Sequence, residues 1–157
     1  MSGCIDQIAC SCNVDWDGRR NWIASVVAGA LFFSAWWIVL DTAMVVDKKD
    51  WTNLYFILTI SSSVAMVLLN AVSNSQVRGD SMNESVLGVT GARLWMLLSF
   101  GLSFACVFAA VGLLFNGYIK PGDHVVWPGV TLLLHNLMIF AASLIYKFGR
   151  VEDLWMI

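Results

Sequence analysis

The chain has 157 residues, of which 59% are hydrophobic and 13% are charged, and its mean hydropathy is +0.73. A soluble domain carries about 25% charged residues, so this composition excludes an ordinary soluble domain. The 9 basic and 11 acidic residues give a formal net charge of −2, so no excess of basic residues points to nucleic-acid binding.

The segment before the first apolar stretch covers residues 1–21. It holds several charged residues but no apolar core of a signal peptide, so the first apolar helix is expected to act as its own insertion signal. Cys4, Cys10 and Cys12 lie in this segment. Three interpretations stay open for them: reduced thiols, palmitoylation close to the membrane, or a metal site. A zinc site would need four ligands, and no histidine lies nearby.

Four stretches are long and apolar enough to cross a bilayer core about 30 Å thick, which takes roughly 20 helical residues. They cover residues 22–46, 52–73, 93–116 and 125–147. Short polar turns follow the first and third stretches, and the longest connection, about 73–91, joins the second to the third. This pattern predicts an all-α integral membrane protein: one domain, four transmembrane helices in an up-down bundle, and a tail at 148–157.

Basic residues in short loops indicate orientation, because they are retained on the cytosolic side. One side of the predicted bundle holds six: Arg19, Arg20, Arg78, Arg93, Lys147 and Arg150. The other side holds three: Lys48, Lys49 and Lys120. The count predicts that both termini are cytosolic. Aromatic belts are then expected at both boundaries: Trp22, Trp95 and Tyr146 on the cytosolic side, and Trp51, Tyr118 and Trp127 on the other.

Three polar residues inside the spans are candidates for function, because burying such groups in lipid is costly. Asp41 is either an interfacial carboxylate bonded to Lys120, His124 or a threonine, or a buried carboxylate that binds a proton, a cation or a basic partner. His135 and Asn136 lie near the middle of the fourth span. Hydrogen bonds between helices are the ordinary role for both side chains.

A polar run leaves the second span and enters the longest connection. Asn70 and Asn74 share a helix face and precede Gln76, Arg78 and Asp80. This run could cap a helix or recognise another protein. Thr59 and the serines at 61–63 can bond to carbonyls one turn back, so we interpret them as packing residues.

Small residues recur at intervals of four, which lets helix backbones approach closely. These stripes are Ala24 with Ala28, Ser25 with Gly29, and Gly101 with Ala105 and Ala109. They suit packing inside the bundle and packing against another subunit equally well. No nucleophile–base pair, phosphate loop or zinc motif occurs, so we predict no catalytic residue, cofactor or metal.

Several strings together resemble one known family. They are Asp15-Trp16 with Arg20-Asn21; Leu31-Phe32-Phe33 through Trp36-Trp37 to Asp41; Asn70-Ala71-Val72-Ser73-Asn74 through Gln76-Val77-Arg78-Gly79-Asp80-Ser81; Thr90-Gly91-Ala92-Arg93 with Trp95; and Phe148-Gly149-Arg150 with Glu152, Asp153, Leu154 and Trp155. From about residue 15 to 155 the chain resembles the four-span transmembrane protein 50 family, also called small membrane protein 1. Its yeast relative is vacuolar protein sorting protein 68. The cysteine-rich start follows the family loosely, and His135 stands where the family would have a neutral amide such as glutamine.

The resemblance implies a non-enzymatic scaffold or adaptor in endosomal or Golgi membranes, serving transport from late endosome to vacuole or lysosome. Its expected partners are another small multi-span membrane protein, the lipid bilayer and a second copy of the chain, with no nucleic acid. A subunit of an oligomeric ion or proton pathway is the alternative, and an intramembrane enzyme is a third hypothesis. The candidate interaction residues are Asp41, Asn70, Asn74, Gln76, Arg78, Asp80, Arg93, Asn136 and Arg150.

Overall fold

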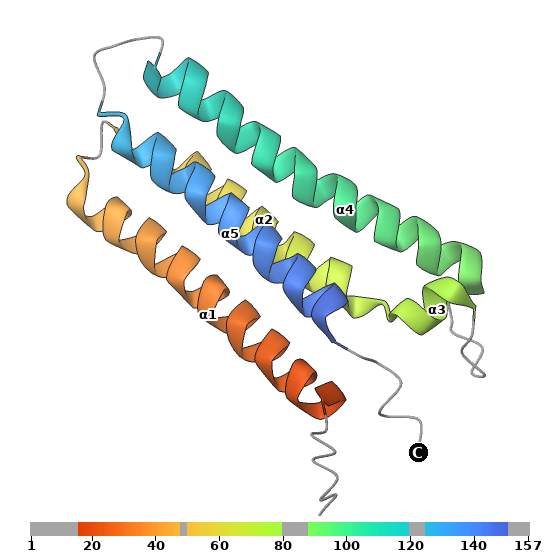
Figure 1. Cartoon of the computed structure of the whole chain (residues 1–157). Helices are drawn as coiled ribbons and strands as arrows, with labels where there is room; N and C mark the ends of the chain where they lie inside the picture. Colours follow the sequence, from red (N-terminus) through yellow and green to blue (C-terminus); the bar gives the residue numbers. More distant parts are fainter. Residues whose placement is uncertain (1–15, 48–49, 80–87, 120–124, 151–157) are drawn as a thin grey trace, which may run out of the picture.

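The computed structural model describes residues 16–47, 50–79, 88–119 and 125–150, with the backbone alone for 16–18. Its long helices are α1 (Trp16–Val45), α2 (Asn53–Ala71), α4 (Gly88–Leu113), which continues as the π-helical turn η1 (Leu114–Ile119), and α5 (Trp127–Gly149). By length and composition these form four candidate membrane spans. They run alternately up and down, and the described residues form no strand (Figure 1). The predicted all-α four-span bundle is confirmed.

Helix α5 lies at the centre of the bundle. It packs against α1, α2 and α4. Helix α1, in contrast, packs mainly along α5 and does not pack closely along α2. In the apolar stretch of α5, 44% of the residues are buried, against 22% in both α1 and α2. The face of α1 that meets α5 is built from small or branched side chains, namely Ala24, Ala28, Ala35, Val39 and Thr42. Such side chains allow two helix backbones to approach closely in lipid.

The threonine and serine hydroxyl groups of α2 all donate hydrogen bonds to backbone carbonyls of the same helix. Thr59 donates to the carbonyl of Phe56 at 2.9 Å, and Ser61 donates to that of Ile57 at 2.7 Å. Ser62 and Ser63 both donate to the carbonyl of Thr59, at 2.8 and 3.1 Å. The predicted bonds from these hydroxyls to carbonyls one turn back are confirmed.

The polar run after α2 folds into a short helix, α3 (Asn74–Arg78), which is closed at both ends. The Ser73 hydroxyl accepts from the Gln76 amide at 3.1 Å, and the Gln76 side chain accepts from the Ser73 amide at 3.1 Å. This reciprocal pair is a capping box. Gly79 ends the helix in the left-handed region, with φ at 86°, which favours glycine. Gln76 is therefore engaged in capping α3.

Removing the cap should loosen α3 without disturbing the spans. We expect Ser73→Ala to reduce the local stability of α3 by about 1 kcal/mol, because the amide of Gln76 loses its acceptor. Hydrogen–deuterium exchange of the amides at 74–79 in detergent should then be several-fold faster. Thr52→Ala is the matched control, because Thr52 precedes α2 without forming a side-chain cap. Unchanged exchange at 74–79 would contradict the prediction.

Two aromatic residues of the predicted boundary belts lie inside the bundle instead. The η1 turn directs Tyr118 inward, where its hydroxyl donates to the Asp50 carbonyl at 2.8 Å and only 3% of the residue stays exposed. Trp51 is also buried and meets Tyr55 and Phe56 edge to face. The belt prediction is therefore wrong for Tyr118 and Trp51. The π-helical turn η1 directs the Tyr118 ring into the bundle, and the rings of Tyr55 and Phe56 pack over Trp51. Trp127, with 56% exposed, faces outward as expected.

Candidate functional site: a cleft between α1 and α2

The ends of α1, α2 and α5 meet at one end of the bundle and are joined by side chains that bond to backbone carbonyls. The buried Lys147 ammonium donates to the carbonyl of Val72, the residue that ends α2. A cation is favoured there because unpaired carbonyls make a helix C-terminus negative. The Asn74 amide donates to the Lys147 carbonyl at 3.2 Å. These bonds fix the end of α5 to the junction between α2 and α3.

Helix α1 is held to the same end. The guanidinium of Arg20 donates to the carbonyls of Gly149 and Phe148, at 2.9 and 3.2 Å. A Cβ atom at Gly149 would lie 2.8 Å from the Cβ of Ala24, so glycine permits the close approach of α1 and α5 there. The two ends of the described chain therefore lie at the same end of the bundle (Figure 1).

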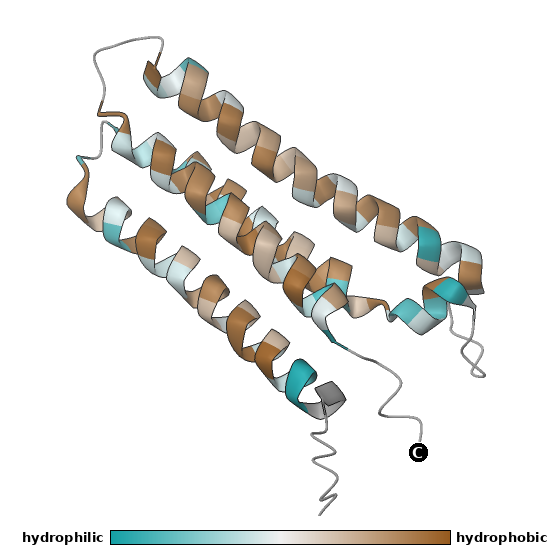
Figure 2. Cartoon of the chain, viewed as in Figure 1, coloured by the Kyte–Doolittle hydropathy of each residue, from teal (hydrophilic) through white to brown (hydrophobic). Residues whose placement is uncertain are grey.

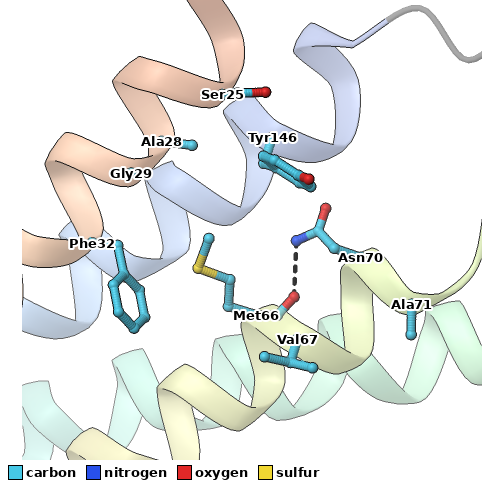
Figure 3. Close-up of a pocket in the computed structure, with 9 residues that line it drawn as sticks. All are labelled: Ser25, Ala28, Gly29, Phe32, Met66, Val67, Asn70, Ala71 and Tyr146. Carbon is cyan, nitrogen blue, oxygen red and sulfur yellow. Dashed lines mark hydrogen bonds between the residues drawn. The ribbon is translucent and has the colours of Figure 1, made fainter. Parts of the chain in front are cut away.

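Next to this end of the bundle, a groove lies between α1 and α2, because α1 packs along α5 and not along α2. Its volume is about 500 Å³. Figure 3 shows Phe32 of α1 and Met66 of α2 projecting into the space between the helices, with Tyr146 of α5 at one end. The other lining residues are mostly small or apolar: Ser25, Ala28, Gly29, Val67, Asn70 and Ala71.

Asn70 marks the polar end of the groove. Its amide nitrogen donates to the Met66 carbonyl at 2.8 Å and to the Ser143 hydroxyl at 3.4 Å. The amide oxygen is buried and has no hydrogen-bond partner. Figure 3 shows this side chain beside the ring of Tyr146. An unpaired acceptor in this position is costly.

A second cavity, of about 310 Å³, adjoins the groove and shares Asn70, Ala71 and Tyr146 with it. Its remaining lining residues are polar or cationic: Ser73, Ser75, Lys147 and Arg150. The guanidinium carbon of Arg150 lies 4.8 Å from the centre of the Tyr146 ring, a cation–π arrangement. We call the groove and this cavity together the α1–α2 cleft. It is apolar within the span and cationic at its end.

A separate polar cluster lies deeper, between α1, α2 and α5. His135 is fully buried, and its Nε2 lies 3.4 Å from the Ser62 hydroxyl. The Trp36 indole meets the imidazole edge to face, with ring centres 5.5 Å apart, and donates to the Ser63 hydroxyl at 3.1 Å. The expected bonding of His135 between helices is confirmed.

Asn136 differs from the prediction of a bond between helices. Its amide donates to the Leu132 carbonyl of its own helix at 2.8 Å, because that carbonyl lies one turn back within easy reach. The amide oxygen has no partner and the side chain borders a void of about 10 Å³. A void of this size has room for about one water molecule.

The remaining predicted residues do not gather at one place. Asp41 is exposed on α1, far along the helix from the joint. Arg93 donates to the Val77 carbonyl at 3.0 Å and so holds α4 to α3, whose last residue is the exposed Arg78. Asp80, the cysteines at 4, 10 and 12, Lys120 and His124 lie outside the described residues. In the part of the chain that the structure describes, no three histidine, cysteine or acidic residues converge as a metal site would require.

Sequence reasoning brought Asn70 and Arg150 forward as candidates but missed their neighbours in the cleft. The sequence marked Lys147 only as one of the basic residues that indicate orientation, and Tyr146 only as a residue of the aromatic belt. One signal was available in the sequence. Ser143 and Lys147 are four residues apart and so share a helix face, as Asn70 and Asn74 do. Nothing in the sequence shows that these faces oppose each other across two helices.

Comparison with known proteins identifies the family. The model of the family described as "Uncharacterised protein family (UPF0220)" matches residues 4–155. The chain belongs to this family. A curated relative named Transmembrane protein 50 homolog, from Dictyostelium discoideum, is 27% identical over 140 residues, covering 81% of this chain and 88% of the relative. The resemblance to transmembrane protein 50 is thus confirmed. No solved structure matches the chain.

Proposed function

We propose that this UPF0220 protein is a non-enzymatic membrane scaffold or adaptor in endosomal or Golgi trafficking, serving transport from late endosome to vacuole or lysosome. Its partner would be another small multi-span membrane protein. Family membership supports a multi-pass membrane protein, and the resemblance to the vacuolar sorting relative suggests the pathway. One structural observation supports the scaffold role: small residues are exposed on the outer face of α4, where another helix would dock.

That surface is a stripe of small residues that the bundle does not use. Gly101, Ala105 and Ala109 are all exposed on α4, at intervals of four, whereas Ala24 and Ala28 of α1 are buried against α5. The structure thus separates the two stripes that the sequence could not distinguish. Small residues on an outer face permit a second transmembrane helix to approach closely.

We propose that the end of the bundle at which α1 begins and α5 ends faces the cytosol. Figure 2 shows hydrophilic residues concentrated at that end, on α3 and near the starts of α1 and α4. All six basic residues counted for that side belong to segments that begin or end there: Arg19, Arg20, Arg78, Arg93, Lys147 and Arg150. The excess of basic residues supports cytosolic termini in an endosomal, Golgi or endoplasmic reticulum membrane.

The transport alternative receives less support from the arrangement of its two key residues. Asp41 lies on the exposed surface of α1, whereas His135 is sealed between three helices. The void beside the neighbouring Asn136 measures about 10 Å³. A conduit would need polar groups along a continuous wet path, and the described helices hold these residues in separate surroundings.

Variants of the α4 stripe test the scaffold role. Ala105→Leu should release a co-purifying multi-span membrane protein and reduce vacuolar or lysosomal delivery, because a larger side chain holds the partner helix away. Ala30→Leu is the matched control, since Ala30 is an exposed alanine on α1. Quantitative proteomics of the detergent-purified chain and a cargo-processing assay give the readouts. Normal delivery without the chain, together with the absence of any multi-span partner, would refute the proposal.

A further inference from the structure

The α1–α2 cleft has the two halves of an amphipathic binding site. Its groove is lined almost entirely by apolar groups, and Figure 3 shows Phe32 and Met66 projecting into the space between α1 and α2. The adjoining cavity carries hydroxyl, amide and cationic groups. Because both halves share Asn70, Ala71 and Tyr146, one molecule with an apolar chain and a polar head can occupy them together.

The charges in the polar half select an anionic head. Lys147 and Arg150 line this cavity, and its described lining residues include no carboxylate. Arg150 stacks on Tyr146, which orients the planar guanidinium, and such a group binds phosphate through paired N–H donors. Ser73 and Ser75 add hydroxyl groups at the same rim.

The depth of the cleft matches a bilayer lipid. Helix α5 has 23 residues, which extend about 35 Å and cross a hydrocarbon core of about 30 Å. Arg150 immediately follows its last residue, so the guanidinium stands at the level of lipid headgroups, while Gly29 and Phe32 lie within the apolar span.

The size of the groove favours an acyl chain over a protein helix. Its volume of about 500 Å³ lies in the range of about 300–1,000 Å³ that is usual for small-molecule sites. A transmembrane helix about 10 Å wide and 30 Å long occupies roughly 2,000 Å³, so it cannot enter the groove. We propose that the α1–α2 cleft binds one anionic glycerophospholipid of the surrounding bilayer, with its phosphate at Arg150 and an acyl chain between α1 and α2.

Two variants separate the two halves of the site. Arg150→Gln removes the charge that meets the phosphate. Gly29→Leu fills the groove, since a Cβ at Gly29 would meet nothing within 4 Å and the variant can fold. The matched controls are Arg19→Gln, an exposed arginine at the same end, and Gly112→Leu, whose added Cβ also meets nothing within 4 Å but lies on α4.

The experiment is native mass spectrometry of the full-length chain, released from bilayers that contain equal amounts of phosphatidylserine and phosphatidylcholine. The wild-type chain should retain one phosphatidylserine in preference to phosphatidylcholine. Arg150→Gln should reduce phosphatidylserine retention about tenfold, the effect of losing one charge-assisted contact. It should also weaken the retention of phosphatidylcholine, which carries the same phosphate but no net charge, and so narrow the preference between the two lipids. Gly29→Leu should reduce retention of both lipids, and both controls should behave as wild type.

Three results would overturn the proposal. One is equal retention of both lipids by the wild-type chain. Another is retention that Arg150→Gln and Gly29→Leu leave unchanged. The third is that Gly29→Leu abolishes association with a second copy or another membrane protein while lipid retention persists, which would assign the groove to a protein. Because the readout is lipid retention, it is independent of the trafficking role and of the α4 surface.

Discussion

Replacing His135 with alanine is expected to lower the free energy of unfolding by about 2–4 kcal/mol. The imidazole is fully buried and joins three helices, through the Trp36 ring of α1 and the Ser62 hydroxyl of α2. Lipid tails are as apolar as the bundle interior, so the loss comes mostly from packing around the vacated space. Unfolding of the purified chain by increasing denaturing detergent, followed by tryptophan fluorescence, measures the change.

Two further variants make the His135 result specific. His135→Gln keeps a polar group facing Ser62 and much of the volume, so it should cost less than about 1.5 kcal/mol. Leu134→Ala truncates the adjacent residue, which is 40% exposed, and should cost less than His135→Ala. If His135→Ala is no more destabilising than Leu134→Ala, the cluster does not hold the three helices together.

Adding a single methyl group at Gly129 should destabilise the opposite end of the bundle. The new Cβ would lie 2.7 Å from the Tyr118 ring and 2.8 Å from the Leu114 side chain. The Leu114 methyl can move, but the Tyr118 ring is buried and anchored by its bond to the Asp50 carbonyl. We expect Gly129→Ala to reduce the free energy of unfolding by about 1–3 kcal/mol, as overpacking does.

The prediction for Gly129→Ala is tested by whether the free energy of unfolding falls or rises. Alanine favours a helix over glycine by about 1 kcal/mol, so helix propensity alone predicts stabilisation. Gly101→Ala is the matched control, because its Cβ would meet nothing within 4 Å, and it should be neutral or stabilising. The same detergent titration reports both variants. A Gly129→Ala chain that is as stable as the Gly101→Ala chain would show that Tyr118 yields at little cost.

The polar run after the second span shows what short-range pattern could predict. Because Ser73 and Gln76 are three residues apart, the sequence already contains a capping box, and capping was one of the two interpretations left open. The partners of Asn70 and Asn74 were beyond reach, since Ser143 and Lys147 lie 73 residues further along the chain. Such contacts depend on which helices become neighbours, which no local pattern specifies.

The sequence by itself determined that the chain crosses the membrane four times, because the length and apolarity of each span suffice in a bilayer about 30 Å thick. It also indicated the family, through strings spread along the chain. Only the tertiary structure decided that α5 is central, that Ala24 and Ala28 on α1 are buried and that the stripe on α4 faces outward. In lipid, a face toward another helix and a face toward the bilayer are both apolar, so hydrophobic periodicity does not distinguish them. The α1–α2 cleft follows from that choice of neighbours.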